Sequence, residues 1–155
     1  MKILVVTVSD RAAAGVYEDR SGPAIEKTLK ELLPDAEVSR TVVPDESAEI
    51  GRALEKGIAV DVILTTGGTG IGPRDVTPEA TAQFCKRLVP GIAEMLRAES
   101  LKQTPGAALS RGVAGVRGKT LVVNLPGSVR GAEFCARLLG PVLKHAIEMM
   151  AGKSH

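Results

Sequence analysis

The chain repeats one pattern, in which a short apolar run rich in β-branched residues precedes a stretch with helical periodicity. Residues 3–8, 38–43 and 60–64 are such runs, and the first is nearly continuous, as expected of a strand that is buried on both faces. Helical patterns open near Ser21, Ser47 and Thr77, and each of these could cap its helix. Strands that alternate with helices predict an α/β domain wound on a mostly parallel sheet.

The last third of the chain departs from this repeat. Gly115, Gly118 and Lys119 interrupt two β-rich pieces that could pair as a hairpin ending near Asn124. Residues 130–150 have helical periodicity, and Gly140-Pro141 should break or kink that helix because proline removes a backbone donor and clashes with the preceding turn. We therefore expect a mixed sheet with one antiparallel part.

Size and composition fit one soluble domain that covers residues 1–155. Hydrophobic residues make up 44% and charged residues 25% of the chain, which is close to the average for globular domains. A chain of 155 residues is long enough for one core. No linker, repeat or low-complexity segment divides it.

Composition also argues against several functional classes. With no Trp, one Tyr and two Phe, the chain lacks the aromatic platform on which single-stranded nucleic acids stack. The net charge of +2 comes from interleaved acidic and basic residues, so no bulk attraction to nucleic acid follows. Cys85 and Cys135 lie in apolar periodic stretches without metal-ligand spacing, which favours buried thiols in a reducing compartment. We find no signal or membrane-spanning pattern and expect a cytoplasmic protein.

Residues with possible chemistry follow the predicted strands. Asp10, Asp45, a glycine cluster that ends in Asp75, and residues 124–128 each come after a strand. Ligands of open α/β sheets bind outside the carboxyl ends of the strands. We therefore expect these residues, which are far apart in the sequence, to meet at one edge of the sheet.

The glycine cluster is the richest of these loops. Four glycines between Thr66 and Asp75 would let backbone N–H groups approach an anion without interference from a Cβ atom. The loop is neither common nucleotide motif: Gly67 and Gly72 have Walker spacing, but Pro73-Arg74 stands where that motif needs Lys-Ser/Thr, and the dinucleotide spacing is absent. A third type of phosphate loop and a structural glycine-rich turn both stay open.

The charged residues of these loops have two interpretations each. Asp45 and Asp75 could hold Mg²⁺, which proteins commonly bind by one or two carboxylates together with substrate phosphates. They could equally cap the helices that follow them. Arg11 and Arg74 could bind phosphate through their guanidinium groups, or could be solvated surface charges.

Five separated motifs, taken in order, resemble the molybdopterin adenylyltransferase family of the MogA/MoaB type, which is also similar to domains of the plant cofactor enzyme and of gephyrin. The resemblance runs almost end to end. The motifs are Ser9-Asp10-Arg11 with Gly15-Val16-Tyr17-Glu18-Asp19, Pro44-Asp45-Glu46, the run from Thr65 to Asp75 followed by Val76-Thr77-Pro78-Glu79-Ala80, Leu109-Ser110-Arg111, and Asn124-Leu125-Pro126-Gly127-Ser128.

The resemblance implies a three-layer α/β/α fold that assembles as a trimer or as two trimers. It also implies an enzyme that converts molybdopterin and Mg-ATP to adenylylated molybdopterin and pyrophosphate, and a partner enzyme that then inserts molybdate. The family's two important acidic positions fall on Asp45 and Asp75, to which we assign metal binding. The residues expected to bind substrate or phosphate are Ser9, Asp10, Arg11, Thr66, Gly67, Gly68, Thr69, Gly70, Arg74, Pro126, Gly127 and Ser128.

Two other functions fit the same motifs. Some proteins of this fold hold the pterin without turnover, and their pocket motifs would look the same. A nucleotide hydrolase is the second alternative, with water in place of the pterin phosphate as the nucleophile. The presence of both Asp45 and Asp75 favours an enzyme over a non-catalytic binding protein.

Overall fold

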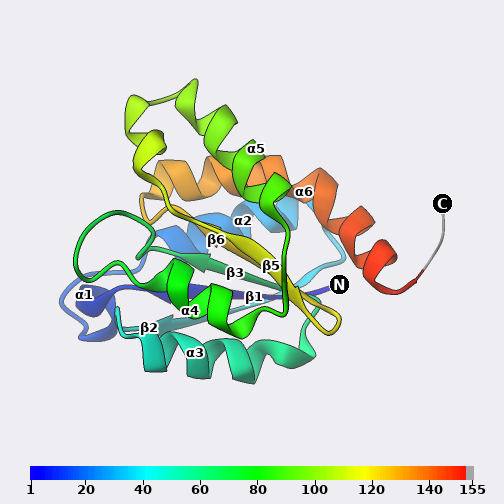
Figure 1. Ribbon diagram of the computed structural model, residues 1–155, viewed down its shortest axis with the longest axis horizontal. Helices are drawn as coiled ribbons and strands as arrows, with labels where there is room; N and C mark the ends of the chain where they lie inside the picture. The colour runs from blue at the N-terminus through cyan, green and yellow to red at the C-terminus, as the bar shows by residue number, and fades with distance from the viewer. Residues whose placement is uncertain (153–155) are drawn as a thin grey trace.

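The computed structural model describes residues 1–152, so the last three residues of the predicted domain lie outside the described part. Figure 1 shows a central sheet with helices on both of its faces. The strands are β1 (Lys2–Val8), β2 (Glu37–Val43), β3 (Val62–Thr66), β4 (Arg87–Leu88), β5 (Ala114–Arg117) and β6 (Thr120–Leu125). The helices are α1 (Asp10–Ala13), α2 (Ser21–Leu32), α3 (Ser47–Lys56), α4 (Thr77–Phe84), α5 (Pro90–Leu101) and α6 (Val129–Met150), with 3₁₀ turns η1 (Gly57–Ala59) and η2 (Pro105–Leu109).

The sheet is mixed and mostly parallel, as the sequence predicts. Within residues 1–152 its six strands lie in the order β2-β1-β3-β6-β5-β4. β1 pairs in parallel with β2 and β3, and β3 pairs in parallel with β6. β5 and β6 form the expected antiparallel hairpin, whose turn contains Gly118 at a φ of 59°. The chain leaves β1 toward β2 and then returns to the other side of β1 as β3, which makes the gap between β1 and β3 a topological switch point.

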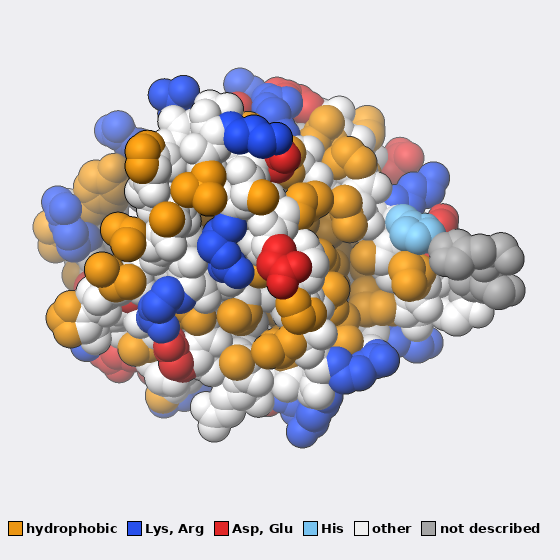
Figure 2. Space-filling model, turned by 45° about the horizontal axis from the view of Figure 1, so that its top comes forward, with side chains coloured by type: hydrophobic (Ala, Val, Ile, Leu, Met, Phe, Trp, Pro, Cys, Tyr) orange, Lys and Arg blue, Asp and Glu red, His pale blue; other side chains and the backbone are white. Residues whose placement is uncertain are grey.

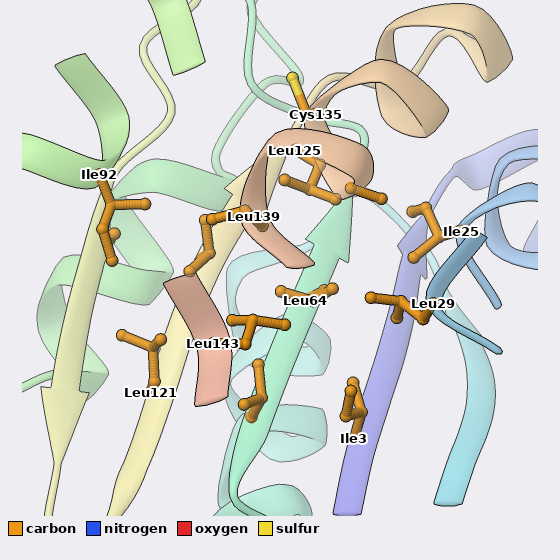
Figure 3. Close-up of a cluster of buried hydrophobic side chains, with 14 of the residues drawn as sticks. Ile3, Ile25, Leu29, Leu64, Ile92, Leu121, Leu125, Cys135, Leu139 and Leu143 are labelled. Carbon is orange, nitrogen blue, oxygen red and sulfur yellow. The ribbon is translucent and has the colours of Figure 1, made fainter. Parts of the chain in front are cut away.

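Successive side chains of the buried strands point to opposite faces of the sheet, so each face has its own hydrophobic core. Ile3 and Val5 of β1 and Leu64 of β3 face α2, α5 and α6. Figure 3 shows Ile3 and Leu64 in one cluster with Leu29 and Leu139. The opposite faces of the same strands pack against α3 and α4. Aliphatic side chains dominate both cores, which agrees with the scarcity of aromatic residues. The fold is therefore the three-layer α/β/α domain that the sequence and the resemblance predict.

Several helix starts differ in detail from the predictions. α2 begins at Ser21, but the carboxylate of Asp19 accepts the Gly22 N–H at 3.0 Å in place of a cap by Ser21 or Gly22. α3 has Glu46 at its N-cap position with no side-chain cap bond, so the Ser47 cap was wrong. Thr77 opens α4, and its hydroxyl donates to Gly67 O at 2.9 Å. Of these three helix starts, only Thr77 exchanges the predicted cap for a hydrogen bond to another loop, since Asp19 acts locally at α2 and α3 has no side-chain cap. The short strand β4 carried no visible sequence pattern.

The predicted break at Gly140-Pro141 does not occur, since α6 runs from Val129 to Met150 with Pro141 inside it. Packing explains the continuity. A Cβ atom at Gly140 would lie 2.7 Å from Leu32 Cδ1 of α2, so the glycine allows a close approach that stabilises α6 across the proline. Of the helices in residues 1–152, α6 included, none combines the length and the apolar character that crossing a bilayer requires.

Candidate active site

The parallel strands end together at one edge of the sheet, as expected. Val8 of β1 is in register with Val43 of β2, and Thr7 of β1 is in register with Thr66 of β3. Thr66 is in turn in register with Leu125 of β6. The loops that follow these four strands therefore start side by side. They carry the acidic residues, the glycine cluster and residues 126–128 that the sequence singled out.

The glycine loop after β3 needs its first two glycines. Gly67 has a φ of 100° and Gly68 a φ of 64°, a region that other L-residues rarely occupy. A Cβ atom at Gly68 would lie 2.4 Å from Thr77 Oγ1, and a Cβ atom at Gly127 would lie 3.1 Å from the Gly67 Cα atom. The backbones of the β3 and β6 loops therefore come close enough to share one site.

Three consecutive N–H groups of this loop stay available. Gly67 N–H donates to Leu125 O at 3.3 Å, and Gly72 N–H donates to Asp75 Oδ2 at 2.8 Å. Between them, the N–H groups of Gly68, Thr69 and Gly70 donate to no protein atom of residues 1–152. Free successive N–H groups form a concave site for an anion. The geometry thus supports the phosphate-loop interpretation, although the same glycines also make the turn.

Two hollows open beside this loop and share a border. The first, of about 560 Å³, lies at the switch point, between the ends of β1 and β3 and the start of α2. The second, of about 400 Å³, lies between the glycine loop, η2 and the start of α6. Four residues line both hollows: Gly68, Asp75, Gly127 and Ser128. A ligand in each hollow would meet the other at this border.

Asp10 and Asp45 bind one another's backbone. Asp10 N–H donates to Asp45 Oδ2 at 2.8 Å, and Asp45 N–H donates to Asp10 Oδ1 at 2.9 Å. Arg74 approaches from the glycine loop and donates to both carboxylate oxygens of Asp10, at 3.0 and 2.9 Å. The two reciprocal hydrogen bonds hold the loops after β1 and β2 together, and the bonds from Arg74 attach the glycine loop to them.

These contacts shift the two carboxyl pKa values in opposite directions. The guanidinium of Arg74, helped by the Asp45 N–H, lowers the pKa of Asp10. Burial raises the pKa of Asp45, and the nearby carboxylates of Asp10 and Asp75 raise it further against the opposing Asp10 N–H. The ionised form of Asp45 is therefore disfavoured at this position, which is typical of a residue whose charge serves a function.

The capping interpretation of the two aspartates was wrong. The N-cap residues of α3 and α4 are Glu46 and Val76, and neither helix has a side-chain cap bond. Asp45 binds the Asp10 N–H at the start of α1 instead, and Asp75 binds Gly72 within its own loop. Both carboxylates border the first hollow.

The donor set at the first hollow fits a cation that is only partly held by protein. Asp19, Asp45 and Asp75 line it, with Arg20 as its basic residue. Within the described residues, however, no three acidic, His or Cys side chains converge as a complete metal site. A Mg²⁺ ion here would use one or two carboxylates and take its remaining ligands from phosphate and water, which is its usual habit.

The structure does not bring every predicted residue to the hollows. Arg11 lies over the Tyr17 ring, 5.1 Å from its centroid, and the Arg74 guanidinium is bound to Asp10. Ser9 accepts the Ala12 N–H with its hydroxyl, and Thr66 Oγ1 donates to Pro126 O at 2.7 Å. The residues of the predicted set that line a hollow are Ser9, Asp45, Thr66, Gly67, Gly68, Thr69, Gly70, Asp75, Pro126, Gly127 and Ser128.

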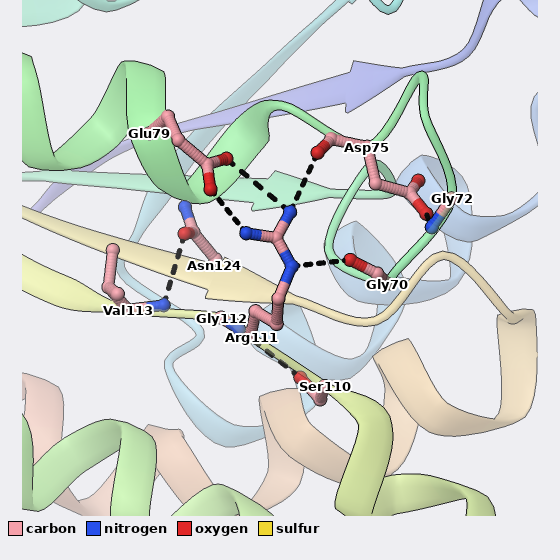
Figure 4. A network of polar contacts seen from close by, with 9 residues as sticks. All are labelled: Gly70, Gly72, Asp75, Glu79, Ser110, Arg111, Gly112, Val113 and Asn124. Carbon is pink, nitrogen blue, oxygen red and sulfur yellow. Dashed lines mark hydrogen bonds and ion pairs between the residues drawn. The ribbon is translucent and has the colours of Figure 1, made fainter.

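Sequence reasoning gave no role to several residues that organise the site. Asp19 accepts from Thr7 Oγ1 at 2.9 Å and from the start of α2. Asn124 is buried and donates to the Thr65 and Thr81 hydroxyls, both at 2.9 Å. Arg111 binds the glycine loop (Figure 4). Asp19, Asn124 and Arg111 lie in the quoted motifs, which was the available signal, but the partners of Asn124 and Arg111 are distant in sequence.

A family model described as a probable molybdopterin binding domain matches residues 4–145. The chain belongs to this family. Its matched span contains both hollows and all the loops described above.

Individual relatives cover nearly the whole chain. A molybdopterin adenylyltransferase of Helicobacter pylori is 42% identical over 152 residues, which are 96% of this chain and 86% of that protein. The crystal structure of the molybdopterin biosynthesis enzyme MoaB from Thermus thermophilus is 46% identical with a TM-score of 0.88, covering 98% of this chain and 97% of that one. The crystal structure of a molybdopterin biosynthesis protein from Mycobacterium abscessus is 40% identical in sequence with a TM-score of 0.91, covering 97% of this chain and 96% of that one.

The glycine loop yields a matched pair of substitutions. Gly68 and Gly118 both have positive φ, at 64° and 59°, so alanine should strain both backbones similarly. A Cβ atom at Gly118 meets nothing within 4 Å, whereas at Gly68 it collides with Thr77 Oγ1. We expect Gly68→Ala to weaken binding of inorganic pyrophosphate about tenfold or more by displacing the free N–H groups, and Gly118→Ala to leave it unchanged. Calorimetry measures both affinities. Equal affinities in the two variants would make the loop a structural turn.

Asp45 and Asp10 should affect stability with opposite dependence on pH. Because folding raises the pKa of Asp45, its stabilising contribution is lost as the pH rises through the folded pKa, so Asp45→Asn should gain Tm relative to the parent between about pH 3 and 7. Folding lowers the pKa of Asp10, so Asp10→Asn should lose Tm relative to the parent as the pH rises toward the ordinary Asp pKa of about 3.9, and little beyond it. Thermal unfolding across both pH ranges tests both signs. Parallel curves for the two variants would contradict the assigned shifts.

Proposed function

We propose that this protein is a molybdopterin adenylyltransferase, which transfers AMP from Mg-ATP to the terminal phosphate of molybdopterin and releases pyrophosphate. The observation that carries the proposal is the pair of adjoining hollows with a common border of Gly68, Asp75, Gly127 and Ser128. A transfer between two substrates requires two adjacent sites whose reacting groups meet. The name of the Helicobacter pylori relative agrees with this chemistry.

The border is suited to phosphate. The free N–H groups of Gly68, Thr69 and Gly70 lie on one side of it. On the other side Ser128 is the N-cap of α6, a helix of 22 residues whose first N–H groups and dipole favour an anion. The Ser128 hydroxyl accepts the Gly131 N–H at 3.2 Å, which fixes the start of α6 beside the two hollows. Phosphate groups of both substrates would thus meet between two sets of backbone donors.

The reaction needs little proton transfer. The terminal phosphate monoester has a second pKa of about 6, so its oxygen is already mostly deprotonated near neutral pH. That oxygen attacks the α-phosphorus of ATP, an α-phosphorus–oxygen bond forms, the bond to the β-phosphate bridge breaks, and pyrophosphate leaves. The protein then contributes position and donors for the phosphate charge, which is the usual division in phosphoryl-type transfer. The adenylylated product would pass to a molybdate-inserting enzyme.

Asp45 and Asp75 would bind Mg²⁺ together with the phosphates of ATP. The ion would offset the repulsion between the two polyanionic substrates and the acidic lining of the first hollow. Asp75 is placed for this because it lines both hollows and because Gly72 N–H holds one of its oxygens at 2.8 Å. Asp45 is held in turn by the Asp10 N–H.

Asp75→Asn should remove most adenylyl transfer and leave the fold intact. The amide keeps an oxygen for the Gly72 N–H but loses the charge that binds the metal, so we expect turnover to fall about 100-fold. Release of pyrophosphate from ATP, Mg²⁺ and molybdopterin measures the rate. Asp61→Asn is the matched control, since Asp61 also accepts a backbone N–H, that of Lys2 at 2.7 Å, but away from the cleft.

The same assay separates the alternatives. Pterin binding without any pyrophosphate release in the parent protein would favour the non-catalytic binding protein. ATP cleavage that proceeds equally without pterin would favour the hydrolase. Full activity of Asp75→Asn at saturating Mg²⁺ would remove Asp75 from the proposed site.

We also propose that the protein assembles as a homotrimer or as two trimers. Large apolar side chains are exposed, among them Val16 at 73%, Ile71 at 69% and Leu109 at 55%. Figure 2 shows hydrophobic side chains spread over one face between charged ones. Closed cyclic symmetry would bury such surface without leaving a free complementary face. Light scattering coupled to size exclusion at micromolar concentration should give three or six times the chain mass of 16.2 kDa, and a constant monomer mass would contradict assembly.

We propose the cytoplasm as the compartment. Cys85 and Cys135 are both free and buried, and burial raises the pKa of Cys85 to about 11. Thiols of this kind stay protonated and inert, which accords with a reducing environment.

A further inference from the structure

Arg111 lies outside the glycine loop and forms hydrogen bonds to it. Its backbone N–H donates to Thr69 O at 2.8 Å, its Nε donates to Gly70 O at 2.7 Å, and its Nη2 donates to Asp75 O at 2.7 Å. Figure 4 shows the guanidinium between the carbonyl groups of Gly70 and Asp75 and the Glu79 carboxylate. One side chain thus holds both ends of the loop segment from Gly70 to Asp75.

Few other contacts hold this segment. The hydrogen bonds between Gly72 and Asp75 lie within it. In the described part of the chain, its other tie to the rest of the protein is the Arg74–Asp10 ion pair, whose side chains are 60% and 43% exposed. Exposed ion pairs contribute little because water screens them. The hydrogen bonds of Arg111 to carbonyl oxygens are therefore the main anchor, and they leave the loop's N–H groups free for a ligand.

Arg111 is itself held on two sides. Arg97 of α5 donates to Gly112 O at 2.8 Å and to Ser110 O at 3.4 Å, so the backbone on each side of Arg111 is fixed. Glu79 of α4 pairs with the guanidinium. Arg111 lowers the pKa of Glu79, and Glu79 raises the pKa of Arg111, so both stay charged at neutral pH. The anchor is thus continuous with two helices of the domain.

We propose that Arg111 is a positioning residue for the reaction, which sets the place of the Asp75 carboxylate and of the free N–H groups at the border of the two hollows. The inference rests on the proposed transferase function. This role requires a guanidinium group. The planar guanidinium donates from several nitrogens in fixed directions, whereas a lysine ammonium on a flexible side chain is a single point of charge. A lysine at this position would keep the positive charge and the ion pair with Glu79, but it would lose some of the hydrogen bonds to the loop carbonyl groups.

The test compares Arg111→Lys with Arg117→Lys. Arg117 is a matched control because it is similarly exposed, 31% against 37%, and pairs with Glu55 outside the cleft. We expect Arg111→Lys to lower kcat about tenfold to about 100-fold at saturating substrates and Mg²⁺, with a smaller change in KM. Hydrogen exchange of the amides in residues 69–75 should become faster in Arg111→Lys at unchanged global stability. Arg117→Lys should alter neither quantity.

Glu79→Gln provides a second variant. It leaves the three carbonyl contacts in place and removes only the ion pair, so its effect on kcat and on exchange should lie between those of the parent and Arg111→Lys.

Three results would overturn the inference: unchanged loop exchange in Arg111→Lys, an unchanged kcat with faster exchange, or a loss of activity that follows only the loss of folded protein. Failure of the proposed function is distinguishable. If the parent protein makes no adenylylated product, the transferase role is refuted, and with it the catalytic part of this inference, while exchange in residues 69–75 still decides whether Arg111 holds the loop.

Discussion

Parallel pairing of β2, β1, β3 and β6 is the constraint on which the site depends. It brings the ends of four strands to one edge, with Thr7, Thr66 and Leu125 in register. Each loop after a strand then adds one component: the acidic pair from the β1 and β2 loops, free N–H groups after β3, and a helix start after β6. The cleft at the switch point follows from this order of strands, and the two buried cores keep the strands in place.

The charged side chains that line the first hollow determine which ligands can bind there. Three carboxylates and one guanidinium line the first hollow, so this protein would repel polyphosphate there unless a cation entered with it. Backbone donors of the glycine loop and of α6 bind anions without adding a formal charge. Burial, and then the neighbouring carboxylates of Asp10 and Asp75, raise the pKa of Asp45, so its ionised form is disfavoured there. A divalent ion bound with the substrate would reverse that cost, which links substrate binding to the metal.

Much of this could be predicted from the sequence, because strands with two buried faces and helices with one apolar stripe have distinct periods. The same reasoning placed Asp45, Asp75 and the glycine loop at one edge. It failed at the start of α2, where the neighbouring Asp19 accepts the Gly22 N–H in place of a Ser21 cap. It also failed at Gly140, where packing of the distant Leu32 accompanies a helix that continues across the proline. Arg111 could not be given a role because its partners, from Glu79 to Thr69, lie 32 to 42 residues away. Arg11 and Arg74 had suitable chemistry, but Tyr17 and Asp10 engage them.

We infer that the two hollows bring both substrates together so that the pterin's own phosphate oxygen forms the new bond to AMP. The most direct measurement uses molybdopterin whose terminal phosphate carries oxygen-18, incubated with the protein, unlabelled ATP and Mg²⁺. Mass spectrometry of the products then locates the label. The account predicts adenylylated molybdopterin with labelled oxygen in the bridge to AMP, together with unlabelled pyrophosphate. Free AMP that has taken its new oxygen from water, with the labelled pterin unchanged, would contradict it.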